Sequence, residues 1–172
     1  MPEANGWSAM ELQRREGYAP GLIAGMLEGH MAYYGPHWGF GAVFETRLAA
    51  QMATFFHSYL EGRDLALSIW RDGRVAGSIC IDGSQRDGTG AHLRWFVLDP
   101  VLRGAGHGRA LLAEALGFVD AGPHRLTWLT TFAGLDAAAH LYSAAGFVLR
   151  GETALDQWQG GVREQRWERG LG

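Results

Sequence analysis

A glycine-rich turn in the second half of the chain carries the clearest chemical signal. The apolar run 96–98 ends at Asp99-Pro100, and the segment 103–109 that follows reads Arg-Gly-Ala-Gly-His-Gly-Arg. Glycines let backbone N–H groups come close to a ligand, and the start of a helix leaves several N–H groups without partners. These donors, with the partial positive charge of a helix N-terminus, bind anions. The turn therefore predicts a site for a phosphate or a pyrophosphate.

Spacing separates the kinds of phosphate-binding turn. A P-loop ends in Gly-Lys-Ser/Thr, which does not occur in this chain. The dinucleotide fingerprint G-x-G-x-x-G fails because Arg109 stands where its third glycine should fall. What remains is the pattern Arg103-x-x-Gly106-x-Gly108. Taken alone, this pattern also fits an ordinary connection between a strand and a helix that binds no ligand.

A second motif, downstream of the turn, narrows the choice. The segment 134–147 reads Gly-Leu-Asp-Ala-Ala-Ala-His-Leu-Tyr-Ser-Ala-Ala-Gly-Phe. Its alanines favour a helix, and Gly146 stands where a helix C-terminus favours a left-handed residue. Together the two motifs resemble the acetyl-CoA site of the GNAT superfamily of N-acyltransferases. The superfamily signature Ala-x-x-x-Tyr…Gly-Phe is matched by Ala138, Tyr142, Gly146 and Phe147.

The resemblance implies that acetyl-CoA is the cofactor. Its phosphates would lie on the N–H groups of the turn, and backbone groups of the preceding strand would hold the pantetheine arm and polarise the thioester carbonyl. Tyr142 matches the general acid that protonates the coenzyme thiolate. Many relatives carry an asparagine where this chain has Leu135, so that contact is either missing or replaced by backbone near Thr131. The implied cofactor residues are Phe96, Val97, Leu98, Arg103, Gly104, Ala105, Gly106, His107, Gly108, Arg109, Thr131, Leu135, Ala138 and Tyr142.

The general base is open between several groups. Burial could raise the pKa of Glu45 to a useful range, and His30 titrates near neutrality. His92 and Arg94 lie on the central strand, where a base is sometimes found, and a chain of water molecules is a further alternative. Glu45 could instead complement a helix dipole, and His30 could be a structural histidine.

The acceptor pocket should combine the two early helices with the terminal strands. Aromatic side chains gather there, and their faces attract cationic amines. The predicted substrate-binding residues are Tyr33, Tyr34, Trp38, Phe40 and Arg94. We therefore expect transfer of an acetyl group to a primary amine of a small molecule or peptide, by direct attack in a ternary complex. The alternative functions are a non-catalytic acyl-CoA sensor on the same fold and a nucleotide-binding α/β protein.

Most elements follow from hydrophobic periodicity and turn residues, but periodicity alone leaves 22–27 ambiguous between strand and helix. The resemblance implies that 22–27 is the first strand and 28–34 a short first helix. We expect a mobile arm over residues 1–20, followed by one domain over 21–172. Its order, β-α-α-β-β-β-α-β-α-β-β, is that of the GNAT fold, a mixed α/β sheet flanked by helices. The expected strands are 22–27, 65–71, 75–82, 91–98, 125–131, 147–155 and 162–169. The expected helices are 28–34, 44–60, 106–121 and 136–145, with a break at Gly35-Pro36 and a loop over 85–90.

A closer resemblance is to the acetyltransferase half of bacterial MarR–GNAT fusion regulators, and we expect their DNA-binding half to be absent from this chain. It rests on His30, Tyr33-Tyr34, Gly39-Phe40, Phe44-Glu45, Asp82-Gly83, the run 92–96, Leu141-Tyr142 and Gly146-Phe147.

Composition excludes several classes of protein. The formal net charge of −3, without a basic cluster, argues against a nucleic-acid partner. The single Cys80 excludes an intrachain disulfide and fits a reducing compartment. No signal-type or membrane-spanning apolar run occurs, so we expect a cytoplasmic protein without membrane contact. The histidines show no metal-ligand spacing, so no metal is expected. Dimers are common in the superfamily, so a homodimer is compatible with the resemblance.

Overall fold

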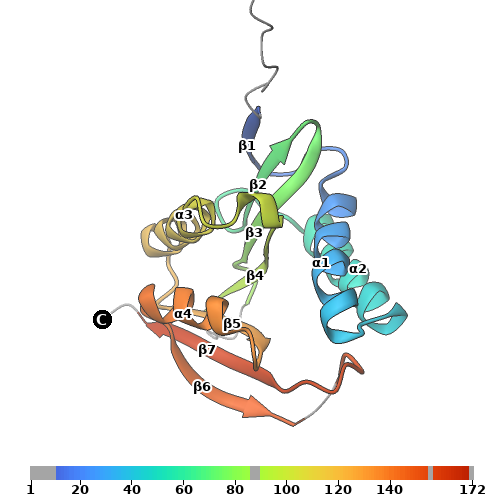
Figure 1. Ribbon diagram of the computed structural model, residues 1–172. Helices are drawn as coiled ribbons and strands as arrows, with labels where there is room; N and C mark the ends of the chain where they lie inside the picture. Colours follow the sequence, from blue (N-terminus) through green and yellow to red (C-terminus); the bar gives the residue numbers. More distant parts are fainter. Residues whose placement is uncertain (1–10, 86–89, 155–156, 171–172) are drawn as a thin grey trace, which may run out of the picture.

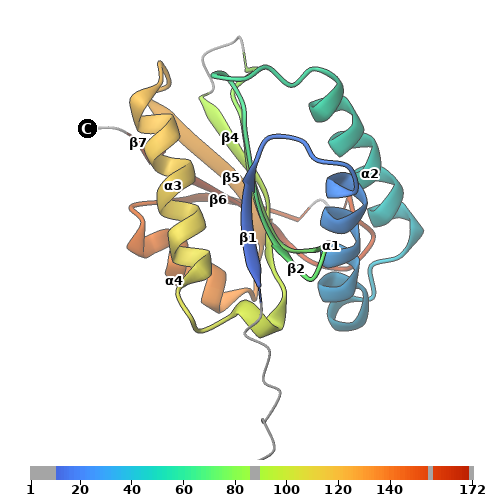
Figure 2. The ribbon, with the colours of Figure 1, turned by 90° about the horizontal axis from the view of Figure 1, so that it is seen from above.

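A mixed seven-stranded sheet with helices on both faces forms the structure (Figure 1; Figure 2). The computed structural model describes residues 11–85, 90–154 and 157–170. The strands lie in the order β1-β2-β3-β4-β5-β7-β6, and the β4–β5 pair is parallel whereas the others are antiparallel. The elements are β1 (Leu12–Glu16), α1 (Leu22–Trp38), α2 (Ala42–His57), β2 (Leu65–Arg71), β3 (Arg74–Asp82), β4 (Ala91–Leu98), the 3₁₀ turn η1 (Pro100–Leu102), α3 (His107–Ala121), β5 (Leu126–Phe132), α4 (Asp136–Ala144), β6 (Val148–Thr153) and β7 (Glu164–Gly170).

The predicted fold class and element order are confirmed. From α2 onward the elements lie close to their predicted positions. The β2–β3 hairpin turns at Asp72-Gly73, where φ is 50° and 77°, the positive values that a two-residue hairpin turn requires. The predicted loop over 85–90 and the end of the predicted strand 147–155 fall partly outside the described residues.

The first strand lies earlier in the chain than predicted. Residues 12–16 form β1, which pairs antiparallel with β2 from Leu12–Arg71 to Glu16–Leu67. The prediction of a mobile arm is therefore wrong for these residues, while residues 1–10 lie outside the described part. β1 is an edge strand whose residues are almost all exposed, so its sequence, Leu-Gln-Arg-Arg-Glu, lacks the alternation that marks a half-buried strand.

The predicted strand 22–27 and helix 28–34 are one long helix, α1. Leu22, Met26 and His30 are buried at a spacing of four residues, so one face of the helix covers the sheet. The predicted break at Gly35-Pro36 is also wrong. The helix runs through Pro36 and ends at Trp38, just before a glycine in the left-handed conformation.

Two hydrophobic cores lie on opposite faces of the sheet. Helices α1 and α2 cover one face, and α3 and α4 cover the other (Figure 2). At Gly25 a Cβ atom would lie 2.6 Å from the Cβ of Val75, so only a glycine lets α1 approach β3 this closely. The candidate active site lies between β4 and β5.

Candidate active site

Strands β4 and β5 run side by side only at their N-terminal ends. Their parallel pairing is limited to Ala91–Thr127 and His92–Trp128. Beyond these residues β5 continues to pair with β7 on its other side, while β4 stays paired with β3. The two strands therefore separate toward their C-terminal ends, and the edge of β4 that faces β5 has backbone groups available for a ligand.

A β-bulge interrupts β4 where the strands have separated. Trp95 and Phe96 stand opposite Ile79 alone, because the register of β3 and β4 shifts there. Trp95 has a φ of 50°, unusual for a large side chain, and its carbonyl accepts a hydrogen bond from Ser78 Oγ at 2.8 Å. A bulge re-aims the side chains beside it, and bulges are frequent next to active sites.

The bulge changes which face of the sheet each side chain meets. The Arg94 guanidinium lies 4.2 Å from the ring centroid of Trp95, so two consecutive residues share the α1/α2 side. Phe96 packs instead against the core on the α3/α4 side. The strand thus presents a polar and aromatic surface to one side of the split and an apolar surface to the other.

Alternation of backbone groups fixes which amides of β4 face the split. The Asp99 N–H donates to the Ala76 carbonyl of β3 at 2.7 Å. Alternate residues of a strand point their backbone groups the same way, so the groups of Phe96 and Leu98 point toward β5. The Arg103 side chain agrees with this direction, because its Nη2 donates to the Leu98 carbonyl at 3.0 Å.

The turn between η1 and α3 forms a row of unpaired donors. Within the described residues, the backbone N–H groups of 104–109 have no backbone acceptor, and Ala110 is the first to donate, to Gly106 at 3.0 Å. Gly104 and Gly106 have φ values of 79° and 84°, conformations that side chains disfavour. Such a run of N–H groups at a helix N-terminus can hold an anion such as a pyrophosphate.

Gly108 has a packing role that the sequence did not reveal. A Cβ atom there would lie 2.8 Å from Leu98 Cδ1 and 3.6 Å from Phe96 Cζ. The glycine therefore lets the first turn of α3 lie directly on the end of β4. This contact positions the N–H groups of the turn relative to the split.

A cavity of about 770 Å³ extends from the turn into the split on the α3/α4 side. Its walls come from β4, the turn, α4 and two tyrosines of α1. Ala138 and Leu141 give it an apolar side, and Leu135 lies at its rim as the N-cap of α4. The cavity contains Phe96, Val97, Leu98, Arg103, Gly104, Gly106, Gly108, Arg109, Leu135, Ala138 and Tyr142 of the predicted cofactor residues, but not Ala105, His107 or Thr131.

Tyr142 lies at the inner end of this cavity. Its side chain is buried against Phe96 and Phe147, with ring centroids 6.3 Å and 5.8 Å away. Burial, with a smaller contribution from Tyr34, raises the pKa of the phenol, which stays protonated at neutral pH. No described side chain or backbone group makes a hydrogen bond to its hydroxyl, so the proton is available to a ligand.

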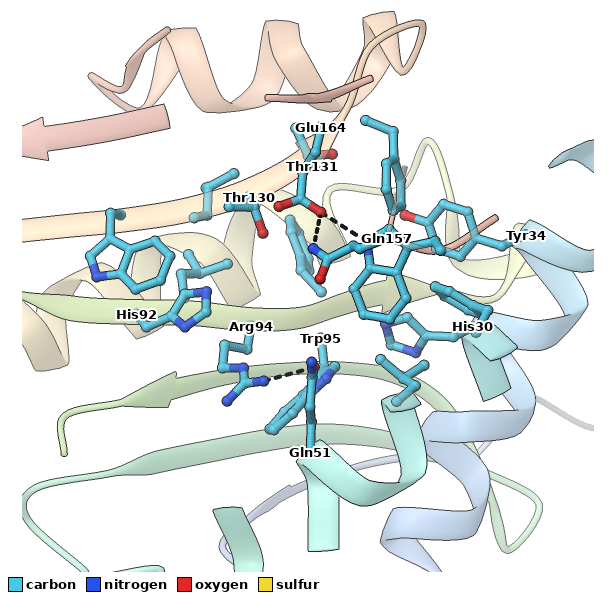
Figure 3. A pocket seen from close by; sticks show the side chains of 18 of the residues that line it. His30, Tyr34, Gln51, His92, Arg94, Trp95, Thr130, Thr131, Gln157 and Glu164 are labelled. Atoms are coloured by element: carbon cyan, nitrogen blue, oxygen red, sulfur yellow. Dashed lines mark hydrogen bonds between the residues drawn. The ribbon is translucent and has the colours of Figure 1, made fainter. Parts of the chain in front are cut away.

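A second cavity, of about 330 Å³, lies on the α1/α2 side of the split (Figure 3). Rings of Phe44, Phe132 and Trp158 form part of its wall, and Arg94, Gln51 and Glu164 add polar groups. Three residues line both cavities: Tyr34, Phe96 and Tyr142. The two cavities therefore approach each other beside the bulge, from opposite faces of the sheet.

His30 projects from α1 into the wall of the second cavity (Figure 3). Its Nδ1 lies 2.7 Å from the Met26 carbonyl, which can only accept, so Nδ1 carries the proton and Nε2 keeps its lone pair. Burial lowers the pKa of His30 to about 4, so the ring is neutral at physiological pH. His30 is therefore a structural histidine with a satisfied Nδ1, and its Nε2 has no described donor.

Comparison with known proteins identifies the family. Residues 21–147 match the model of the acetyltransferase (GNAT) family. The chain belongs to the GNAT family. No curated protein matches the sequence.

Solved structures of low sequence identity share the GNAT fold. An acetyltransferase of the GNAT family from Staphylococcus aureus Mu50 is 16% identical with a TM-score of 0.73, over 94% of this chain and 100% of that one. A ribosomal-protein-alanine N-acetyltransferase from Brucella melitensis is 18% identical with a TM-score of 0.72, over 92% and 99%. A Bacillus anthracis protein, provisionally named a streptothricin acetyltransferase and solved with acetyl coenzyme A, is 20% identical with a TM-score of 0.54, over 64% of each chain.

GNAT acetyltransferases use acetyl-CoA, and the cavity of this GNAT protein fits it. The fit rests on the N–H groups of 104–109, which have no backbone acceptor among the described residues, and on the edge of β4 that β5 leaves open beyond His92. No group of acidic, histidine or cysteine side chains in the described residues could hold a metal ion. Among the described helices, none combines the length and apolar character needed to cross a bilayer.

Several predicted site residues of this GNAT protein lie away from the acceptor cavity. Glu45 is exposed in the first turn of α2 and lines neither cavity, so its position fits the helix dipole rather than catalysis. Trp38 and Phe40 pack against Phe132 behind the cavity, with ring centroids 5.6 Å and 5.3 Å from it. Tyr33 lines the cofactor cavity, and only Tyr34 and Arg94 of the five predicted substrate residues reach the acceptor cavity.

Three other predicted site residues, Val97, Thr131 and His92, also have positions that the structure defines more closely. Val97 faces β3, with which it pairs at Ser78, whereas Phe96 and Leu98 face the split. Thr131 lines the acceptor cavity rather than the cofactor cavity. His92 also lines the acceptor cavity, stacked on Trp128 at 3.6 Å, and burial lowers its pKa to about 3.

Sequence reasoning missed an acidic residue of the acceptor cavity. Glu164 begins β7, and its Oε2 accepts hydrogen bonds from Gln157 Nε2 at 2.7 Å and Trp158 Nε1 at 2.8 Å (Figure 3). Its side chain reaches the cavity because β7 inserts between β5 and β6, opposite Phe132 of β5. One available signal was the cluster Gln157-Trp158…Glu164, which places polar groups beside an aromatic ring at the start of a terminal strand.

Proposed function

We propose that the protein transfers the acetyl group of acetyl-CoA to a primary amine by direct attack in a ternary complex. The acceptor is an amine of a small molecule or peptide. The supporting observation is the meeting of two cavities beside the β4 bulge, where they share Tyr34, Phe96 and Tyr142. A thioester entering from one face and an amine from the other would come together there, so that proximity lowers the barrier.

Direct attack needs no nucleophile from the protein. Cys80 is the one cysteine of the sequence, and it is buried in β3. Burial raises the pKa of its thiol well above the ordinary value, which suppresses the reactive thiolate. The amine of the acceptor is therefore the attacking group.

The backbone of β4 stabilises the charge that develops during transfer. Acetyl-CoA supplies a thioester whose carbonyl oxygen becomes negative as the amine attacks. The N–H groups of Phe96 and Leu98 point to the split and can donate to that oxygen. One such donor contributes about 3 kcal/mol in other enzymes. The N–H groups of 104–109 hold the phosphates, with added charge from Arg103 and Arg109.

Two side chains then move protons. The Tyr142 hydroxyl, protonated and without a described partner, donates its proton to the leaving thiolate. His30 Nε2 accepts a proton from the attacking nitrogen, which becomes strongly acidic as it bonds to the acyl carbon, so a weak base suffices. We therefore assign the role of the base to His30 and not to Glu45, which lies outside both cavities.

The acceptor that fits best is small, with apolar or aromatic character. A volume of about 330 Å³ is at the low end of ligand pockets, and the walls are largely aromatic. The kinship with MarR–GNAT fusion regulators, the cytoplasmic location, and a homodimer are further predictions that accompany this proposal.

A screen of amines tests the proposal. The protein is incubated with acetyl-CoA and a panel of small aliphatic, aromatic and peptide amines, and release of free thiol is measured. We expect turnover with small apolar or aromatic amines. Tight binding of acetyl-CoA without turnover of any amine would instead support the acyl-CoA sensor. Turnover confined to bulky polar aminoglycosides would refute the proposed acceptor class.

A further inference from the structure

The acceptor cavity carries opposite charges on two walls. The guanidinium of Arg94 comes from β4 on one side, and the carboxylate of Glu164 comes from β7 on the other (Figure 3). The rings of Trp158 and Phe44 line the same cavity. A ligand that matches both walls must carry a positive and a negative group.

Arg94 is held in place by its neighbours. Its Nη1 donates to Asp82 Oδ2 at 3.3 Å and its Nη2 donates to Gln51 Oε1 at 2.9 Å. Asp82 also accepts from the Ser84 N–H at 3.0 Å, and the guanidinium lies on the Trp95 ring. The side chain is therefore fixed before any substrate binds, which reduces the entropy cost of using it for recognition.

The charge of Arg94 is incompletely compensated. A guanidinium has five N–H donors, and the described side chains account for two of them. The carboxylate of Asp82 is shared with Ser84, and its contact with Arg94 is long for a charge-assisted hydrogen bond. Burial lowers the pKa of Arg94 in spite of Asp82, so a second anion beside the guanidinium would be stabilising.

Glu164 offers the complementary wall. Both of its described donors, from Gln157 and Trp158, bind Oε2, and no described N–H group binds Oε1. Oε1 can therefore accept from a ligand ammonium group. The Trp158 ring, positioned by the same hydrogen bond, adds an aromatic face that attracts cations.

We propose that the acceptor is a free amino acid with an apolar or aromatic side chain. Its carboxylate binds Arg94, and its side chain packs against Phe44 and Trp158. Its ammonium group lies on the Glu164 side, loses one proton to solvent water, and attacks as the neutral amine. This inference rests on the proposed acetyl transfer and names the substrate class of the same site. The small volume of the cavity agrees with a free amino acid better than with a peptide segment.

Paired substrates test the inference in the wild-type protein. The kcat/KM with acetyl-CoA is measured for phenylalanine, phenylalanine amide and phenylethylamine, and for the tryptophan and leucine series. A charge-assisted contact predicts that the amino acid exceeds its decarboxylated amine by about 10- to 150-fold. Equal or higher kcat/KM for the amines would overturn the inference but leave acetyl transfer intact. No turnover of any substrate, with acetyl-CoA bound, would overturn the proposed function itself.

Substitutions of Arg94 test whether this residue causes the preference for an amino acid over its decarboxylated amine. In Arg94→Gln the ratio of kcat/KM for amino acid over amine should fall toward one, and Arg94→Lys should keep part of it. The matched control is Arg169→Gln, which removes a guanidinium from its pair with Asp120, away from the cavity, on a side chain of similar exposure (18% against 17%). That variant should keep the wild-type ratio. An unchanged ratio in both Arg94 variants, with normal acetyl-CoA binding, would overturn the inference, and Arg94→Lys preserves this test if Arg94→Gln fails to fold.

Discussion

Replacement of Tyr142 by phenylalanine tests whether the Tyr142 hydroxyl donates a proton to the leaving thiolate. The change removes one hydroxyl and keeps the ring that packs against Phe96, Phe147 and Trp167. No described group makes a hydrogen bond to that hydroxyl, so its loss leaves no protein donor or acceptor unsatisfied. We expect the free energy of unfolding to change by less than about 1 kcal/mol.

The magnitude on turnover follows from the chemistry of the leaving group. A positioned general acid contributes about 10²- to 10⁴-fold. A thiol with a pKa of about 8.5 is already a fair leaving group, so the low end applies. We expect kcat for Tyr142→Phe to fall about 100-fold, and the affinity for acetyl-CoA to change little. Because burial holds the pKa of Tyr142 above its ordinary value, deprotonation of the phenol should not reduce wild-type activity near neutral pH.

Single-turnover measurement of thiol release is the appropriate assay, because product release can hide a slower chemical step. Calorimetry measures the affinity for acetyl-CoA in parallel. Tyr59→Phe is the control, since Tyr59 lies in neither cavity, and it should match the wild type. Tyr34→Phe removes the other hydroxyl at the junction and should have the smaller effect. A wild-type single-turnover rate for Tyr142→Phe would refute the role of this phenol as the acid.

Three further predictions concern packing, titration and the acidic residues. Gly108→Ala should weaken acetyl-CoA binding and cost about 1 kcal/mol of stability, the low end for overpacking, because the end of the Leu98 side chain must move. Gly117→Ala, in open space on the same helix, should gain about 0.5–1 kcal/mol. Equal effects of the two changes in thermal melts and calorimetry would contradict the packing at Gly108. His30 binds fewer protons folded than unfolded, so stability should fall as pH drops from about 6.5 to 4, by up to roughly 3 kcal/mol. His30→Asn should flatten that part of the stability profile from denaturant titration, and an unaltered slope would count against its burial. Glu45→Gln should leave kcat/KM close to the wild-type value, because Glu45 is exposed and lines neither cavity. Glu164→Gln should raise KM for the amine. The reverse order of effects would restore Glu45 as a candidate base.

Local signals made the cofactor side predictable from the sequence. The turn 103–109 and the helix with Tyr142 are contiguous motifs, in which glycine positions and helix periodicity constrain the backbone directly. Even here the packing of Gly108 on Leu98 required the structure, because the two residues belong to different elements. In the sequence, a glycine that lets the turn bind a ligand cannot be told apart from a glycine that lets the turn pack against β4.

The acceptor side was predictable only in part, because it is assembled by long-range pairing. Glu164 reaches the cavity through the insertion of β7 between β5 and β6, and Arg94 lines it because β4 pairs with β5 only as far as His92. Neither event has a local sequence pattern. The misplaced first strand has a similar cause, since β1 is an exposed edge strand that its pairing with β2 stabilises.

Two-substrate kinetics test the central claim most directly, namely that the two cavities deliver thioester and amine to one point between β4 and β5. Initial rates are measured over a grid of acetyl-CoA and amine concentrations. A ternary complex predicts double-reciprocal lines that intersect. Parallel lines, the mark of a covalent acyl-enzyme, would contradict direct attack and the meeting of the two cavities as its structural basis.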